Sequence, residues 1–245
     1  DKPRDYPYST VERANLVEAL WRHHRVRRTV VVTFDYTSLA LLELLRRQLE
    51  RRPPERATTH DIAGPVITAV FMMNGGLFAD MHTHPWQGTP LLRTLLGALG
   101  MRRAQRSSRV FGTAMTQAQM YSRGYRPAPG ELAEMWSAVT RRDGAAFLHN
   151  AAGFVGEHRR HAQRWDLAAI ARDLNGAVAL YVGGSDEDPY EHRQIPATRE
   201  RVPQAEVLTF PGGHLTTSEH PDLLAAAIRD IAVRHGVGSP APIQR

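Results

Sequence analysis

Four short apolar segments alternate along the chain with segments of helical periodicity. The first, residues 29–33, is a continuous β-branched run, which is typical of a strand buried on both faces. Apolar runs at 65–73, 177–182 and 206–210 predict three further strands. Because strands that alternate with helices form parallel sheets with right-handed crossovers, the pattern predicts an α/β fold.

The segments between these runs predict the helices that flank the sheet. Residues 38–52 place leucines on one side and charged residues on the other, as expected of a helix packed on a sheet. Helical spacing also covers residues 11–23, where Ser9 or Thr10 can cap the helix. Two more helices are expected near 191–201 and 221–235.

A long insert, residues 79–165, separates the second and third predicted strands and contains no convincing strand. Helical patterns near 91–99, 131–141 and 147–161 predict a helical cap. We therefore expect a core formed by residues 1–78 and 166–245, with the cap over the carboxyl edge of its sheet. Ligands bind at that edge in such folds, and a cap would exclude water from the site.

Composition narrows the class of protein. The chain has 245 residues, of which 42% are hydrophobic, so it can bury a sizeable core. It carries 31 Lys and Arg against 25 Asp and Glu, and Lys2 is the only lysine. The arginines lie in scattered pairs rather than one block, which favours solvated helix faces over a nucleic-acid surface. The lack of cysteine excludes disulfides, thiolate metal sites and a cysteine nucleophile.

Targeting signals are not evident in the sequence. No apolar run approaches the roughly 20 residues needed to cross a bilayer, and the first ten residues lack the order of a secretory signal. We expect a cytoplasmic protein that binds a small-molecule substrate and neither membrane nor nucleic acid.

Polar motifs follow each predicted strand. They are TFDYTS at 33–38, NGGLF at 74–78, GGSDEDP at 183–189 and GGH at 212–214. In this order, and over nearly the whole chain, they resemble the α/β-hydrolase superfamily. The resemblance is to the Asp-nucleophile branch, which includes epoxide hydrolases, haloalkane dehalogenases and mesoderm-specific-transcript-like proteins.

The resemblance implies a catalytic triad and no cofactor. Asp35 would be the nucleophile on a sharp strand-to-helix turn, the nucleophile elbow. Its attack on carbon would leave an ester, which water activated by His214 would hydrolyse. Asp188 or Asp186 would orient the imidazole; Asp188 is favoured by its Asp-Pro step, and Asp186 has the better spacing from the preceding strand. The implied substrates are epoxides, haloalkanes or esters, and Tyr rather than Trp at position 36 favours epoxides or esters.

Further residues are candidates for contacting the substrate or an oxyanion. They are Tyr36 through its N–H, Asn74, Tyr121, Tyr125, Trp86 and Trp136. The two cap tyrosines would donate to an epoxide oxygen, although ordinary packing also accounts for all four aromatic side chains of the insert. Asp35 could likewise be a helix cap, and His214 a turn residue. The pairs His82-x-His84 and His158-x-x-His161 lack accompanying carboxylates or cysteines, so no metal site is predicted.

Two departures from the family pattern bear on activity. Thr33 and Thr37 stand where small residues are usual, and Phe34 replaces a histidine. A left-handed conformation at the elbow costs on the order of 1–3 kcal/mol, and β-branched neighbours should raise that strain. These changes favour an alternative function, a hydrolase-fold protein that binds an apolar ligand or guides a non-hydrolytic rearrangement.

The second departure concerns the strands that family members place before the elbow, with a His-Gly loop that supplies an oxyanion donor. The first residues, DKP, resemble a stretch that follows those strands, so we expect the strands to be missing from this sequence. The 29–33 strand would then be an exposed apolar edge. Three explanations remain open: a fragment of a larger enzyme, a homodimer through that edge, or an N-terminal helix folded over it.

Overall fold

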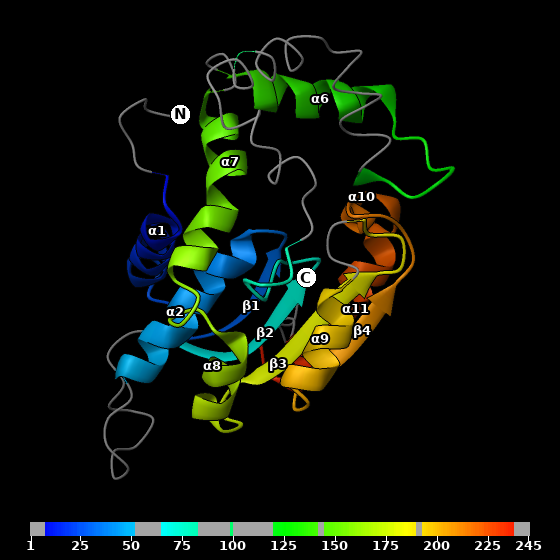
Figure 1. The fold of residues 1–245 in the computed structure, drawn as a ribbon. Coiled ribbons are helices and arrows are strands. Elements are labelled where there is room, and N and C mark those ends of the chain that lie inside the picture. Colours follow the sequence, from blue (N-terminus) through cyan, green and yellow to red (C-terminus); the bar gives the residue numbers. More distant parts are fainter. Residues whose placement is uncertain are drawn as a thin grey trace, which may run out of the picture.

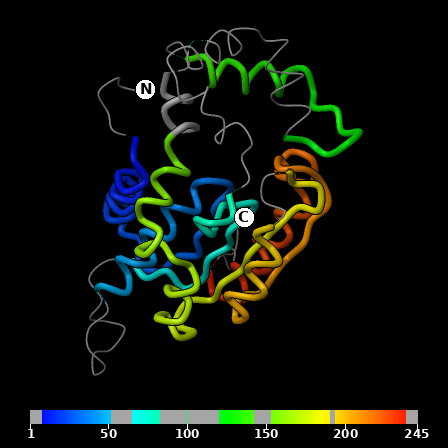
Figure 2. Tube along the Cα trace, viewed as in Figure 1, coloured from blue at the N-terminus to red at the C-terminus, as the bar shows by residue number. Residues whose placement is uncertain are grey.

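A computed structural model describes residues 8–51, 65–82, 99, 120–141, 145–189 and 193–237, with the backbone alone for 145–152. Its centre is a parallel sheet in the order β1-β2-β3-β4 (Figure 1). The strands are β1 (Arg28–Phe34), β2 (Val66–Met73), β3 (Ala179–Ser185) and β4 (Glu206–Phe210). The colours in Figure 2 run across the sheet from blue β1 to orange β4, so each strand lies beside the strand that comes before or after it along the chain. The predicted α/β fold is confirmed.

Helices cover both faces of this sheet. On one face α2 (Thr37–Arg51) and α9 (Gln194–Arg201) pack against the strands, and α1 (Thr10–His23) and α8 (Leu167–Leu174) pack against α2. The other face packs against α11 (Pro221–Arg234), which follows the short α10 (Thr216–Glu219). The four predicted core helices are present with small shifts at their ends. Sequence periodicity missed α8, whose eight residues are too few for a clear pattern; Asp166 caps it by accepting from Ala168 N–H.

Alternation along β2 explains the two cores. Val70 and Met72 face the cluster formed with α2, whereas Phe71 and Met73 face α11. All four side chains are buried. A central parallel strand with helices on both sides has few solvent-facing positions, and β2 is accordingly apolar apart from Thr68.

β1 lies at one end of this order and pairs with β2 alone within the described part of the chain. Val32 is 41% exposed, in contrast to the buried residues of β2. The expectation of an exposed apolar edge at this strand agrees with the described residues. A homodimer formed through that edge remains a prediction.

Two helices of the insert are described, α6 (Pro129–Thr140) and α7 (Ala145–Arg160). Figure 1 shows α6 beyond the carboxyl ends of the strands, with α7 running from it toward α2. Near its end α7 joins the core, because Phe154 is buried there and Glu157 accepts from Thr10 N–H at 2.9 Å. The division into core and cap stays a prediction, and the helix expected near 91–99 falls outside the described residues apart from Leu99.

A buried carboxylate on α2, that of Glu43, binds the segment between α7 and α8. Glu43 accepts from Arg164 Nε at 2.7 Å, Trp165 Nε1 at 2.8 Å and Arg47 Nε at 2.8 Å. Desolvation alone would raise the pKa of Glu43, but these donors outweigh it and lower the pKa to about 2. The ionised form of Glu43 is therefore part of the folded structure.

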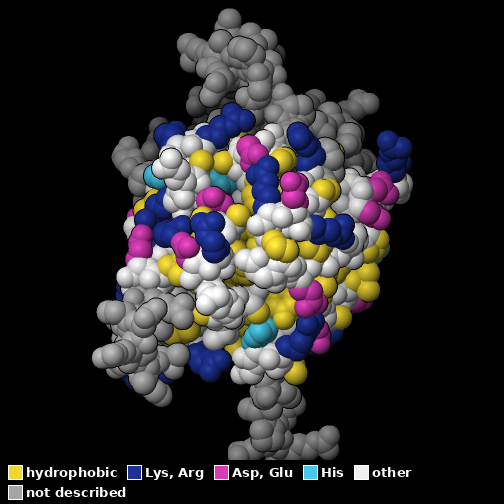
Figure 3. All heavy atoms as spheres, turned by 60° about the horizontal axis from the view of Figure 1, so that its bottom comes forward, with side chains coloured by type: hydrophobic (Ala, Val, Ile, Leu, Met, Phe, Trp, Pro, Cys, Tyr) yellow, Lys and Arg dark blue, Asp and Glu magenta, His cyan; other side chains and the backbone are white. Residues whose placement is uncertain are grey.

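The surface has mixed charge. On the face in Figure 3, Arg side chains are interspersed with acidic and neutral groups rather than gathered in one block. None of the described helices combines the length and apolarity needed to cross a membrane.

Candidate active site

The turn between β1 and α2 has the geometry of an elbow. Asp35 has φ of 54°, a left-handed conformation that is strained for a residue other than glycine. Its N–H donates to Met73 O at 3.0 Å, and its carbonyl accepts from Ser38 N–H at 3.1 Å. These bonds hold the strained residue between the neighbouring strand and the first turn of α2.

The residues around the elbow compensate for its β-branched neighbours. Thr37 Oγ1 accepts from Phe34 N–H at 3.0 Å, and Thr33 Oγ1 lies 3.1 Å from Ser38 Oγ. The loop after β2 leaves room for the Ser38 side chain, since a Cβ on Gly75 would lie 2.4 Å from Ser38 Oγ. The expected strain at Asp35 is present, and its side chain still points to the imidazole described next.

His214 lies between two carboxylates at the carboxyl edge of the sheet. Its Nδ1 is 2.9 Å from Asp188 Oδ2, and its Nε2 is 3.8 Å from Asp35 Oδ1. The side chains of His214 and Asp188 are almost completely buried, whereas that of Asp35 is 24% exposed. The carboxylate on the elbow is thus the member of the three that solvent or a ligand can reach.

The two carboxylates control the protonation of the imidazole. Desolvation lowers the pKa of His214, but the interactions with Asp188 and Asp35 outweigh it and raise the pKa to about 10. The two carboxylates therefore favour the protonated form of the imidazole in the resting site.

The structure distinguishes the two candidate acids. Asp188 contacts His214, whereas Asp186 Oδ1 accepts from Gly212 N–H at 3.0 Å. Asp186 thus braces the loop that carries His214 without touching the imidazole. Asp186 directly follows the last residue of β3. Asp188 lies two residues further along the chain, where it reaches His214.

Asn74 occupies a structural position in this site. Its Nδ2 donates to Ser185 Oγ and to His214 O, both at 2.8 Å, and its Oδ1 accepts from Ser185 N–H at 2.9 Å. The residue is buried with φ of 45°. Because these contacts occupy its amide, Asn74 ties β2 to β3 and to the histidine loop in this structure, rather than facing a substrate.

Tyr36 follows Asp35, and its backbone and ring have different surroundings. Within the described residues its N–H meets no acceptor. Its ring stacks on Phe154 of α7 with centroids 5.5 Å apart, and the Arg13 guanidinium lies 5.0 Å from the ring centroid. The N–H is therefore available to an oxyanion, while the ring packs between α1 and α7.

The aromatic candidates of the insert lie in other contacts. Tyr121 donates its hydroxyl to Glu131 at 2.6 Å, and Tyr125 donates to Ser218 O at 3.3 Å. Burial and the bond to Glu131 raise the pKa of Tyr121, which keeps the phenol neutral. Trp136 is half-buried on α6, and Trp86 falls outside the described residues. The hydroxyls of Tyr121 and Tyr125 are thus bonded within the protein.

The histidines of the insert form a pair. His82 Nε2 lies 2.8 Å from His158 Nδ1, and burial lowers the pKa of His158 to about 4. His161 instead packs on the Trp165 ring at 4.5 Å. Among the residues that the structure describes, no group of three or more His, Cys, Asp or Glu side chains is arranged so that it could hold a metal ion.

Sequence reasoning missed two groups near the triad. Ser185 is a partner of Asn74, and Glu219 binds the backbone of Gly213 beside His214. Ser185 lies in the GGSDEDP motif, but nothing in the motif indicates its contact with Asn74, and Glu219 lies outside the motifs at the strand ends. Only the tertiary contacts identify them.

Comparison with known proteins identifies the family of the chain. The chain is 30% identical over 237 residues to the Mycobacterium tuberculosis protein named "Putative hydrolase LipZ". The aligned region covers 95% of this chain and 75% of that protein. It is 28% identical over 184 residues to the human mesoderm-specific transcript homolog protein, covering 70% of this chain but only 48% of the relative. No protein-family model matches the chain.

Solved structures extend the likeness of fold. The haloalkane dehalogenase DatA from Agrobacterium tumefaciens superposes with a TM-score of 0.61 at 15% identity, covering 96% of this chain and 76% of that one. At such identity the superposition bears on the fold alone. Together with the match to LipZ, it shows that the chain belongs to the α/β-hydrolase superfamily, as an α/β-fold hydrolase related to LipZ and the mesoderm-specific transcript proteins.

Proposed function

We propose that the protein hydrolyses small molecules with an electrophilic carbon, epoxides or alkyl halides, through a covalent ester on Asp35. The observation that carries this is the line of three side chains in which His214 meets Asp35 on one side and Asp188 on the other. A carboxylate held at φ of 54° on a strand-to-helix turn is presented as a nucleophile.

In the first step a carboxylate oxygen of Asp35 attacks the substrate carbon. The new C–O bond forms while the bond to halide or epoxide oxygen breaks, and its electron pair leaves with that group. A halide departs as an ion, and an epoxide alkoxide takes a proton from solvent. No general base is needed, so the cationic state of His214 does not obstruct this step.

Ester formation prepares the second step. It removes the negative charge of Asp35, one of the two charges that raise the pKa of His214. The imidazole then releases its proton more readily, and neutral His214 can take a proton from water. Hydroxide adds to the ester carbonyl, the acyl C–O bond breaks, and the alcohol leaves with the proton from His214. The acid proton that remains on Asp35 then passes to His214, which restores the carboxylate and the protonated imidazole.

The developing oxyanion needs donors. Tyr36 N–H supports that role because it has no acceptor in the described structure. Asp188 holds the imidazole through Nδ1 and stabilises its cation, as in Ser-His-Asp hydrolases.

Trapping of the ester tests this proposal. His214→Ala protein should gain the mass of the whole epoxide from an epoxide, or of the alkyl group in place of hydrogen from a haloalkane, and peptide mapping should place the adduct on Asp35. The double variant with Asp35→Asn is the matched control and should gain nothing. A panel of both substrate classes, with carboxylic esters as a third arm, identifies the leaving group. Absence of any adduct and any turnover across the panel would refute the proposal.

A second candidate is a hydrolase-fold protein that binds an apolar ligand without hydrolysing it. It is favoured by Phe34, whose ring lies 5.2 Å from that of His214, and by the hydroxyls of Tyr121 and Tyr125, which are bonded within the protein. This candidate predicts saturable ligand binding in Asp35→Asn protein, with no turnover by the wild type.

A further inference from the structure

The loop that carries His214 is held from several sides. Beside the acid on its imidazole, the His214 carbonyl accepts from Asn74 and the preceding Gly213 N–H donates to Glu219 Oε1 at 2.9 Å. Glu219 ends α10, five residues after His214. Its side chain thus turns back toward the backbone immediately before the imidazole.

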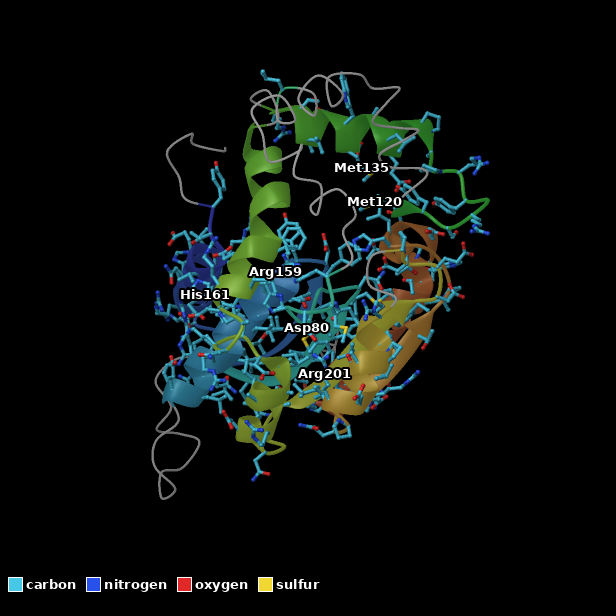
Figure 4. All side chains as sticks on the ribbon, viewed as in Figure 1. Asp80, Met120, Met135, Arg159, His161 and Arg201 are labelled. Carbon is cyan, nitrogen blue, oxygen red and sulfur yellow. The ribbon has the colours of Figure 1, made fainter. Side chains whose placement is uncertain are left out.

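The same carboxylate also binds the insert. Glu219 Oε1 accepts from Ser122 N–H at 3.0 Å, and Oε2 accepts from the Ser122 hydroxyl. Next to this contact, Leu215 N–H donates to Met120 O at 2.8 Å. Figure 4 shows Met120 beside α10, below Met135 of α6. The side chain of Glu219 therefore connects the loop that carries His214 to residues 120–122 of the insert.

The two backbones touch at this point. A Cβ on Gly213 would lie 2.5 Å from Tyr121 C and 2.5 Å from Ser122 N, closer than any tolerated contact. Glycine is therefore required for the approach, and the approach brings Ser122 within reach of Glu219. The insert forms one wall of the histidine loop.

We propose that Glu219 is a positioning residue for His214, which holds the imidazole in line with the ester on Asp35 by tying Gly213 to Ser122. The role rests on the proposed function. Asp188 fixes the rotation of the ring, and Glu219 fixes the backbone from which the ring extends. A displacement of about 1 Å at a reacting group can lower a rate by 10²-fold, so this fixation matters for the second step.

The two-step mechanism separates positioning from general structural support. Attack by Asp35 needs no base, whereas ester hydrolysis needs His214 at the right place. Loss of Glu219 should therefore slow hydrolysis and leave ester formation nearly unchanged. A change that merely loosened the fold would slow both steps together.

Three substitutions of Glu219 separate the effect of its side-chain length from that of its charge. Glu219→Gln retains an oxygen that can accept from Gly213 and Ser122, so it should keep most of the hydrolysis rate. Glu219→Asp keeps the charge but is one methylene shorter, and Glu219→Ala loses both properties. The last two should hydrolyse the ester about 10–10²-fold more slowly and accumulate the Asp35 adduct. The matched control is Glu187→Gln, at an exposed carboxylate that accepts from Arg123 N–H on the same insert segment.

Rapid mixing with the best substrate of the trapping panel, followed by intact-mass analysis, measures formation and decay of the adduct. Thermal unfolding of each variant reports on the fold. Slow decay with normal formation in the Asp and Ala variants, and near-normal decay in the Gln and control variants, is the expected result. Wild-type decay in the Ala or Asp variant, or equal slowing of both steps, overturns the inference. If His214→Ala forms no adduct, the proposed function itself fails, which is a separate outcome.

Discussion

The Nδ1 atom of His214 lies 2.9 Å from Oδ2 of Asp188, and both side chains are shielded from solvent. Asp188→Asn removes the charge that stabilises the imidazolium and favours the wrong tautomer. We expect kcat to fall by about 10²–10⁴-fold. Asp186→Asn is the matched control, because its amide oxygen can still accept from Gly212 N–H. Steady-state kinetics should show less than about tenfold loss for that control; equal losses would contradict the assignment.

Stability should depend strongly on Asn74. Asn74→Ala leaves Ser185 N–H and His214 O without their buried partner, and each such loss costs about 1–3 kcal/mol. We expect urea unfolding to show a loss of about 2–4 kcal/mol. Asn175→Ala controls for backbone strain, since Asn175 has φ of 47° but is exposed at the end of α8. A similar loss in both variants would assign the effect to strain instead.

The carboxylate of Glu43 should contribute to stability mainly above its folded pKa. Its pKa is lowered to about 2, so the contribution is complete above the ordinary value near 4.5 and is lost as pH falls toward 2. Glu43→Gln should cost about 2–3 kcal/mol at pH 7 and flatten this acid dependence. Glu50→Gln alters a bond to the same Arg164 at an exposed position and should cost about 0–1 kcal/mol. Chemical unfolding across pH measures both, and a larger loss at Glu50 would be incompatible with the proposed contribution of Glu43.

His158 should make the protein sensitive to mild acid. Burial lowers its pKa to about 4, so between pH 6.5 and 4 the unfolded chain binds a proton that the folded protein excludes. Stability from this source is complete above pH 6.5 and falls on acidification through that window. His158→Asn should therefore lose less stability between pH 7 and 5 than the wild type, whereas His24→Asn, at an exposed position, should behave as the wild type. Unchanged acid sensitivity in His158→Asn would exclude the effect.

His214 has the opposite pH dependence. Its pKa is raised to about 10, so its stabilising contribution is complete below pH 6.5 and is lost as pH rises through 10. Asp35→Asn removes one of the two charges responsible and should reduce the loss of stability between pH 7 and 10. Thermal unfolding over that range, compared with Asp186→Asn, tests the relationship; identical slopes would show that Asp35 does not stabilise the cation.

The sequence was sufficient for the elements whose chemistry is local. The apolar run of β2 follows from burial on both faces, and the motif around Asp35 marks a turn between strand and helix. The order of motifs at the strand ends also predicted that Asp35 and His214 would meet, because parallel strands end at one edge.

Features made by distant contacts could not be predicted in this way. Nothing near Asn74 indicates that its amide is occupied by Ser185, and nothing near Glu219 indicates that it reaches Ser122. The choice between Asp186 and Asp188 likewise depended on how the chain turns after β3. Such contacts depend on tertiary packing, which periodicity does not encode.

The glycine at position 213 has a consequence for how the protein loses function. Tyr121 and Ser122 lie directly against Gly213, so the proposed role of Glu219 implies that the imidazole stays aligned only while that stretch of the insert is in place. Local opening requires less free energy than global unfolding. A brief detachment of residues 120–122 would thus abolish activity while the sheet stays intact. Loss of activity should therefore precede global unfolding when the temperature is raised.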